Sequence, residues 1–259
     1  TNISDLLFRF PYDRLPENDF VALFMRPEVL LGLLLFYWVS KPPLKMLMTQ
    51  LAINPKSTSF RNLVALHNLG LAIFSAITMI NSWPVVFQHL YREGVMATYC
   101  DRAGTLWASG LGAWSTIFYI SKFYEFVDTW VLVLKGKEPS FLQVYHHTGI
   151  VIVMWIGVAS QGSWLSIAVM LNSAIHTAMY TYFLIKTIWP EKQIKAARFL
   201  TTAQIGQFIT GIIYSIGIFL MGDSCGSQLS RFGAAFLDIY GLGLIALFVA
   251  FASKKYKKK

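Results

Sequence analysis

Residues 141–160 read FLQVYHHTGIVIVMWIGVAS. The segment has about the 20 mostly apolar residues that one helix needs to cross a bilayer. Its first turns carry Gln143, His146 and His147, at positions i, i+3 and i+4, which lie on one face of a helix. Polar groups are costly in lipid, so this face is expected to point toward other protein. The segment therefore predicts a bundle of membrane helices with a polar interior.

The composition of the whole chain is that of a membrane protein. Its 259 residues are 55% apolar and only 14% charged, whereas soluble domains carry about 25% charged residues. We expect residues 1–259 to form one all-α, polytopic membrane domain, with residues 1–28 as a lumenal N-terminal segment and residues 253–259 as a cytosolic basic tail. Seven transmembrane helices are predicted, over residues 29–49, 63–83, 110–134, 141–160, 164–185, 199–221 and 232–252.

The distribution of basic residues predicts the orientation of these helices. Loops on the cytosolic side of membrane proteins carry an excess of lysine and arginine. With the N-terminus lumenal and the C-terminus cytosolic, the lumenal segments hold only Arg9, Arg14, Arg26, Arg92, Arg102 and Arg231. The cytosolic segments then hold Lys41, Lys45, Lys56, Arg61, Lys135, Lys137, Lys186, Lys192, Lys195, Arg198, Lys254, Lys255, Lys257, Lys258 and Lys259.

The same orientation places both cysteines in lumenal loops. Cys100 is expected after the second span and Cys225 after the sixth, and disulfides persist on that side of the membrane. We expect a Cys100–Cys225 disulfide, with two free thiols as the alternative. Asn2 begins a lumenal glycosylation sequon. The tail SKKYKKK matches a dilysine retrieval signal of early secretory membranes, although a basic anchor on the cytosolic side would read the same.

The third predicted span carries the sequence KFYEFVDT at residues 122–129. Lys122, Glu125 and Asp128 recur every three residues and share a helix face, with Thr129 beside them. A pair between Lys122 and Glu125 would offset part of the cost of burying their charges. The alternative is a purely structural ion pair that fixes helix packing.

Polar rows also occur in the fifth and sixth predicted spans. The fifth contains NSAIHTAMYTYF, in which Asn172 and His176 lie four residues apart; Met179, Tyr180 and Tyr182 follow. The sixth contains TTAQIGQF, whose polar residues recur every three positions. The structural alternatives are a hydrogen-bonded core histidine and glutamines that join helices. The row of the sixth span comprises Thr201, Gln204, Gln207 and Thr210.

Four polar faces on four spans predict a polar chamber within the membrane, nearer its cytosolic side. A histidine-box membrane oxidoreductase, of the desaturase or hydroxylase kind, is one possible use of such a chamber. The chain has only five histidines, too few for the di-iron site of such enzymes. A single metal on His146, His147 and His176 is an alternative, but adjacent histidines in one helix diverge by about 100°, so we expect no metal. A seven-span transporter or receptor without chemistry is another alternative. The five histidines are His67, His89, His146, His147 and His176.

Four motifs together resemble the signatures of a known family. KFYEFVDT, QVYHH, HTAMYTYF and TTAQIGQF resemble, in order and spacing, the four signatures of the ELO-type very-long-chain fatty acid elongases. The resemblance covers about residues 25–255. Many members have histidine where this chain has Gln143, and glutamine at this position occurs among members that act on polyunsaturated chains.

The resemblance implies a condensing enzyme of the endoplasmic reticulum membrane. Such an enzyme joins a long-chain acyl-CoA to malonyl-CoA and releases a 3-oxoacyl-CoA two carbons longer, CO2 and CoA. It needs no cofactor beyond its CoA-linked substrates and no nucleic acid. Its partners are the reductase and dehydratase enzymes of the elongation cycle. Whether the protein forms a homo-oligomer is left open.

The residues suggest roles within that reaction. No serine or cysteine stands beside the histidines, so an imidazole is the expected nucleophile. We assign this role to His146, with His147 binding substrate; the sequence does not decide between the two. His176 would activate the nucleophile or the malonyl group. Glu125 and Asp128 would orient the imidazoles and Lys122 would offset their charge. Asn172 and Gln204 would donate hydrogen bonds to an oxyanion.

The two substrates are expected in different parts of the chamber. The acyl chain would enter an enclosed apolar tunnel between helices, and the CoA nucleotide would stay at the cytosolic mouth, where basic residues meet its phosphates. The expected CoA contacts are Lys186, Lys192, Lys195, Arg198, Lys254 and Lys255. The other expected substrate contacts are Gln143, Thr129, Met179, Tyr180, Tyr182, Thr201 and Gln207.

Overall fold

The computed structural model describes residues 19–50 and 54–256, and every regular element in these residues is a helix. In chain order the elements are α2 (Asp19–Met25), α3 (Pro27–Val39), α4 (Lys41–Gln50), α5 (Thr58–Cys100), the π-turn η2 (Trp107–Leu111), α6 (Gly112–Tyr124), α7 (Phe126–Leu134), α8 (Phe141–Ala159), α9 (Leu165–Ile188), α10 (Ala196–Met221), the 3-10 turn η3 (Gly222–Ser224) and α11 (Gln228–Tyr256).

Four segments of the described chain are helical, long and apolar enough to cross a membrane. They are α5, α8, the segment Ala196–Ser224 that contains α10, and α11. α3 is apolar but shorter. The prediction of an all-helical membrane protein is therefore confirmed for the described residues. Seven spans, their orientation and an enclosed tunnel stay predictions.

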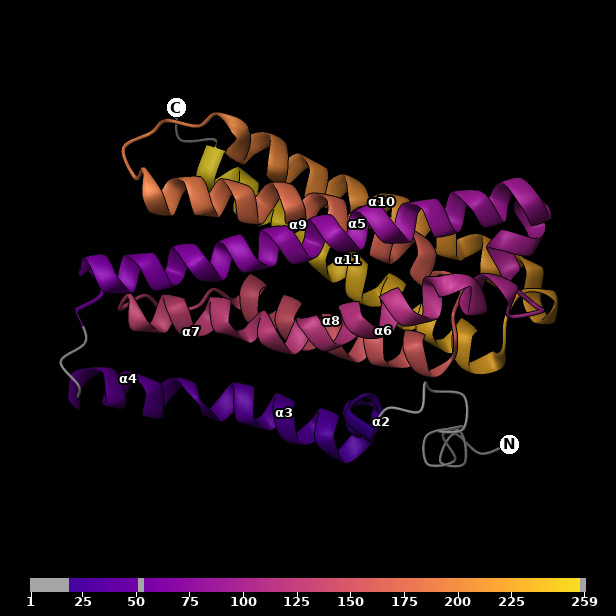
Figure 1. The fold of residues 1–259 in the computed structure, drawn as a ribbon, viewed down its shortest axis with the longest axis horizontal. Coiled ribbons are helices and arrows are strands. Elements are labelled where there is room, and N and C mark those ends of the chain that lie inside the picture. The colour runs from indigo at the N-terminus through magenta and orange to yellow at the C-terminus, as the bar shows by residue number, and fades with distance from the viewer. Residues whose placement is uncertain (1–18, 51–53, 257–259) are drawn as a thin grey trace.

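The long helices lie side by side in one bundle (Figure 1). The most extensive contact is between α5 and α9, followed by that between α10 and α11. α8 packs against both α6 and α11. The indigo helices α3 and α4 run along one edge of the bundle in Figure 1, where α4 contacts α7. The polar faces of α6, α7, α8, α9 and α10 are thus brought into one assembly.

Two of the predicted spans are interrupted. The span predicted over residues 29–49 divides at Ser40 into α3 and α4, because Pro42 and Pro43 have no N–H to donate and start a new helix. The span predicted over residues 110–134 divides at Glu125 into α6 and α7. At that break the Glu125 carboxylate is held by side chains from two helices, as described below.

α5 is longer than the predicted second span. It begins after Ser57, whose hydroxyl accepts a hydrogen bond from the Phe60 N–H at 3.2 Å, as an N-cap residue should. It bends at Gly94, where φ is 84°, a conformation that favours glycine. His89 lies at this bend, with its two ring nitrogens each 2.9 Å from the hydroxyls of Thr98 and Thr105. His89 is therefore a structural histidine.

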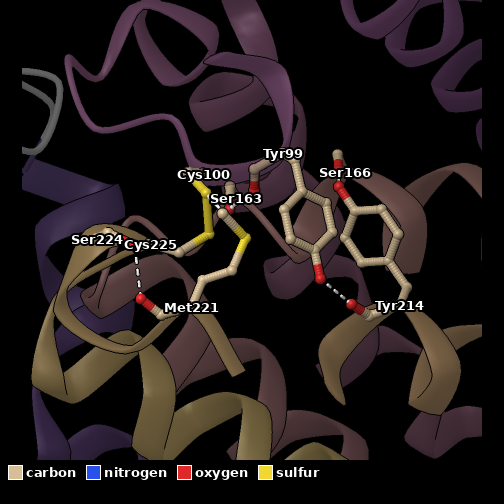
Figure 2. Close-up of a disulfide and its surroundings, with 8 residues drawn as sticks. All are labelled: Tyr99, Cys100, Ser163, Ser166, Tyr214, Met221, Ser224 and Cys225. Atoms are coloured by element: carbon tan, nitrogen blue, oxygen red, sulfur yellow. Dashed lines mark hydrogen bonds between the residues drawn. A yellow bond between two sulfur atoms is a disulfide. The ribbon is translucent and has the colours of Figure 1, made fainter. Parts of the chain in front are cut away.

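A disulfide joins Cys100 to Cys225, 125 residues apart in the chain (Figure 2). This is the pair expected from the sequence, although Cys100 is the last residue of α5 and not part of a loop. Beside it, Ser163 donates a hydrogen bond to the carbonyl of Tyr99 at 2.6 Å, and the Tyr99 hydroxyl donates to the carbonyl of Tyr214. The disulfide therefore ties the end of α5 to the connection between α10 and α11. Asn2 and residues 257–259 lie outside the described residues.

Removal of the disulfide should destabilise the protein without altering its site. Native disulfides typically contribute about 2–5 kcal/mol, largely by constraining the unfolded chain. We expect Cys100→Ser, Cys225→Ser and the double variant to lower the midpoint of thermal unfolding in detergent by the same amount. Additive losses in the double variant would contradict a single shared bond.

Candidate functional site

A cavity of about 670 Å³ lies where six helices meet. Its walls come from α5, α7, α8, α9, α10 and α11, and from Glu125 between α6 and α7. Each of the four polar rows read from the sequence contributes to it. The predicted site residues that line it are Glu125, Asp128, Gln143, His146, His147, His176, Met179, Tyr180, Tyr182, Lys186, Thr201, Gln204, Gln207 and Lys255.

A buried ion pair lies directly behind the inner wall. Lys122 is fully buried, and its Nζ lies 2.6 Å from Glu125 Oε1 and 3.2 Å from Asn172 Oδ1. The same ammonium group lies 3.8 Å from the centre of the Phe118 ring, a distance at which a ring face attracts a cation. Glu125 Oε1 is also 3.3 Å from His176 Nδ1. The pair therefore connects the break between α6 and α7 to α9.

Several polar atoms at the cavity have no hydrogen-bond partner within the described residues. They are Glu125 Oε2, His147 Nδ1, His176 Nδ1 and Gln207 Oε1, all buried. The contact between His176 and Glu125 is thus close enough for an ion pair but is not a well-directed hydrogen bond. Buried polar atoms are nearly always hydrogen-bonded. These atoms leave the cavity wall with polar groups that can bind a polar molecule.

His146 has a defined partner on another helix. Its Nδ1 lies 2.8 Å from the hydroxyl of Tyr240 in α11, and that hydroxyl donates to the His146 carbonyl at 3.0 Å. The His146 and His147 rings are 5.5 Å apart and inclined by 56°. The two adjacent histidines therefore both border the cavity but hold different positions in it.

The mouth of the cavity is basic. Pro55 and Pro190, from two connecting loops, line the cavity together with cationic side chains. Burial lowers the pKa of Lys135, the residue that follows α7. The positive charge of Lys137 lowers it further. The cationic side chains that line the cavity are Lys56, Arg61, Lys135, Lys186 and Lys255.

The sequence pattern of the ELO: GNS1/SUR4 family matches residues 22–259. The chain belongs to the ELO family. It is similar to the fatty acid elongase sre1 of Dictyostelium discoideum, with 32% identity over 207 residues that cover 79% of this chain and 76% of that protein. It is also similar to fatty acid elongase 2 of Trypanosoma brucei brucei, with 30% identity over 218 residues and 78% of each chain covered. Long chain fatty acid elongase 2 of Caenorhabditis elegans is 31% identical over 160 residues, which cover 62% of this chain and 58% of that one.

In this ELO-family protein, Asp128 contacts a different histidine from those the sequence analysis expected. Its Oδ1 lies 2.8 Å from His67 Nε2, and its Oδ2 accepts from the Tyr180 hydroxyl at 2.7 Å. The other ring nitrogen of His67 lies 3.2 Å from the Tyr124 hydroxyl. Asp128 therefore contacts the imidazole of His67 and the hydroxyl of Tyr180. Its expected role in orienting the imidazoles of the site stays a prediction.

Some predicted residues lie behind the cavity or away from it. Asn172 accepts from Lys122 and does not line the cavity. Thr129 is also behind the wall, where it accepts from Gln143 Nε2 at 3.1 Å. Thr210 is exposed and donates to the Gly206 carbonyl. Four predicted CoA contacts are absent from the cavity lining: Lys192, Lys195, Arg198 and Lys254.

Other site residues were not predicted. His67 was visible as a polar residue within an apolar span, but only the register of α5 against α7 brings it to Asp128. Tyr240 lies among apolar residues of α11, and the sequence around it gives no signal of a polar partner. Lys56, Arg61 and Lys135 were expected on the cytosolic side without a role, because only the tertiary structure decides which of the cations near the helix ends line the cavity. Within the described residues, no three or more His, Cys, Asp or Glu side chains are grouped so that they could hold a metal ion.

The Lys122–Glu125 pair predicts a strong coupling between two substitutions. Removal of one partner from a buried pair costs about 3–5 kcal/mol, because the other charge stays buried alone. Lys122→Met and Glu125→Gln should each lower the midpoint of thermal unfolding in detergent by several degrees. The double variant should lose less than the sum of the two, and additive losses would show that the two charges are not coupled.

Proposed function

We propose that this ELO-family protein is the condensing enzyme of fatty acid elongation. It joins a long-chain acyl-CoA to malonyl-CoA and releases a 3-oxoacyl-CoA two carbons longer, CO2 and CoA. The observation that carries this proposal is the set of three histidines, His146, His147 and His176, on the wall of one cavity with a basic mouth. The elongase names of the relatives agree with it.

The proposed setting is the endoplasmic reticulum membrane, with the protein as a single seven-span domain. α9 and the pairs α3–α4 and α6–α7 supply the three spans beyond the four long apolar helices. The N-terminus is lumenal and the C-terminus cytosolic. In support, Lys56 and Arg61 stand at the beginning of α5 and line the mouth, whereas Cys100 ends the same helix in a disulfide. The two ends of α5 thus suit a reducing and an oxidising compartment.

Each substrate suits a different part of the cavity. The basic side chains at the mouth suit the phosphates of CoA, while the apolar acyl chain suits the interior, where Val64, Leu132, Phe208 and Phe248 line the wall. The 3-oxoacyl product keeps its CoA group and passes to reductase and dehydratase enzymes. No metal or cofactor takes part.

In the first step, His146 attacks the thioester. Its Nε2 lone pair forms a bond to the carbonyl carbon, the carbon–sulfur bond breaks, and CoA leaves as a thiolate. The ring keeps the proton on Nδ1, so the intermediate is an N-acylimidazolium. Gln204 donates to the oxyanion that forms transiently on the carbonyl oxygen.

In the second step, malonyl-CoA replaces CoA. Loss of CO2 leaves a carbanion at the carbon next to the thioester, and this carbanion attacks the acyl carbon. The carbon–nitrogen bond breaks, and its electron pair returns to His146 Nε2 as the neutral ring. His147, whose Nδ1 has no hydrogen-bond partner within the described residues, binds the malonyl group together with His176. Glu125, 3.3 Å from His176 Nδ1, holds the His176 ring in place, and Lys122 holds Glu125.

Acylation of His146 can be tested by intact mass spectrometry. The protein is incubated with a long-chain acyl-CoA without malonyl-CoA, together with His146→Ala and His147→Ala. We expect a mass gain of one acyl group that is lost in His146→Ala, retained in His147→Ala and mapped to His146. If condensation proceeds without any adduct, His146 is not the nucleophile. It would then act as a base while the two substrates react directly with each other. If the unsubstituted protein forms no condensation product from the two substrates, the proposed function itself is contradicted.

The basic mouth predicts a selective effect on substrate binding. A hydrogen bond to a charged phosphate contributes about 1.5–3 kcal/mol, so Arg61→Gln should raise KM for acyl-CoA about tenfold and leave kcat unchanged. The matched control is Lys45→Gln, since Lys45 is exposed, pairs with Glu138 and does not line the cavity. Equal effects of the two substitutions on KM would indicate that the overall positive charge of the protein attracts acyl-CoA, and would contradict a local contact of Arg61 with a phosphate.

A further inference from the structure

We propose that Tyr240 is a positioning residue that fixes the proton of the neutral His146 ring on Nδ1 and thereby aims the Nε2 lone pair at the substrate. This inference rests on the proposed function and adds to it a residue from α11, outside all four motifs. Tyr240 is buried and does not itself line the cavity.

The assignment follows from the number of protons that the two side chains carry. A phenol has one proton to donate. The Tyr240 hydroxyl lies 3.0 Å from the carbonyl oxygen of His146, which can only accept, and 2.8 Å from His146 Nδ1. Both contacts are hydrogen bonds at the same time only when the phenol donates to the carbonyl and Nδ1 donates to the phenol oxygen. We therefore place the proton of the neutral ring on Nδ1 and its lone pair on Nε2.

Nε2 of His146 is open to a substrate. The ring lines the cavity, and Nε2 has no hydrogen-bond partner among residues 19–50 and 54–256. Because the hydrogen bond at one imidazole nitrogen decides which nitrogen is protonated, Tyr240 acts through its contact at the back of the ring. The reacting side of the ring stays unobstructed.

The Tyr240 ring is held in place by a reciprocal contact between α8 and α11. Tyr145, next to His146 in α8, stacks on Tyr240 with ring centres 5.5 Å apart and planes inclined by 25°. The Tyr145 hydroxyl donates to the Tyr240 carbonyl at 3.3 Å. Each helix therefore sends a tyrosine hydroxyl to the backbone of the other, and only that of Tyr240 also meets a histidine.

Two glycines make room for these rings. A Cβ on Gly149 would lie 2.2 Å from Cε2 of Tyr240, and a Cβ on Gly243 would lie 2.2 Å from the hydroxyl of Tyr145. Either clash would force a ring to move. Four residues on two helices thus form a support whose centre is the contact of Tyr240 with His146.

The fixed proton matters for both steps of the proposed reaction. Attack by Nε2 leaves the acylated ring with a positive charge, because the proton stays on Nδ1. The phenol oxygen accepts that hydrogen bond throughout and takes no proton. The cationic ring is a better leaving group than a neutral acylimidazole, so the second step benefits as well. Without Tyr240 the proton is free to move to Nε2, where it removes the nucleophilic lone pair.

The tautomer can be measured without substrate by 15N NMR of the full-length protein labelled at histidine. The His146 signals are assigned by their absence in His146→Ala. We expect a protonated Nδ1 and an unprotonated Nε2 in the unsubstituted protein, and a shift of the proton toward Nε2 in Tyr240→Phe. An unsubstituted protein with the proton on Nε2 overturns the inference, with no variant needed.

The kinetic arm compares two tyrosine variants. At saturating acyl-CoA, Tyr240→Phe should acylate about tenfold more slowly, which corresponds to about 1.4 kcal/mol, with KM unchanged. Tyr145→Phe removes the reciprocal hydroxyl but leaves the contact with His146, so its tautomer should be unchanged and its rate should stay within twofold. Equal losses in the two variants, or an unchanged rate in Tyr240→Phe, overturn the inference.

The two arms separate this inference from the proposed function. If the unsubstituted protein forms no adduct and no condensation product, the proposed function fails. The position of the His146 proton, measured by NMR, still tests whether Tyr240 fixes the tautomer. If the adduct forms on His146 but the tautomer of Tyr240→Phe is unchanged, the function stands and the role of Tyr240 is refuted.

Discussion

The buried pair between Lys122 and Glu125 is the interaction on which the rest of the site depends. Two charges within a membrane bundle are tolerated only when each has a close partner. Here the ammonium group also contacts Asn172 and the Phe118 ring, and the carboxylate also contacts His176. The pair therefore fixes the break between α6 and α7 against α9, and this arrangement sets one wall of the cavity.

Around this fixed wall, some polar atoms have no hydrogen-bond partner among the residues that the structure describes. They are Glu125 Oε2, His147 Nδ1 and Gln207 Oε1, whose side chains line the cavity. Such atoms cost free energy in the absence of a ligand. The cost is consistent with a preorganised site, in which groups are held ready for charge that develops during reaction. The tyrosine support between α8 and α11 has the same character, since Gly149 and Gly243 admit rings that position one histidine.

The sequence predicted those features that depend on a single helix. The 3.6-residue period placed Gln143, His146 and His147 at one cavity, and the i, i+3 spacing predicted the contact of Lys122 with Glu125. The compartment argument predicted the disulfide partners. Each of these predictions follows from spacing within one helix or from the expected side of the membrane. None of them requires knowledge of how the helices pack against one another.

The features that the sequence did not predict depend on how helices meet. The contacts of His67 with Asp128 and of Tyr240 with His146 join residues 61 and 94 positions apart, and no pattern within one helix indicates them. The breaks at Ser40 and Glu125 divided two apolar runs that hydropathy reads as continuous. Among the cations expected on the cytosolic side, only the three-dimensional structure separates Lys56 and Arg61, which line the cavity, from Lys192, which does not.

We propose that His146 carries the acyl chain between two half-reactions. This role can be tested by the release of free CoA when the protein is mixed rapidly with acyl-CoA alone. We expect a burst of about one equivalent of CoA per active site before any malonyl-CoA is added, as for other covalent intermediates. CoA that appears only after malonyl-CoA is added, in step with the 3-oxoacyl product, would contradict it.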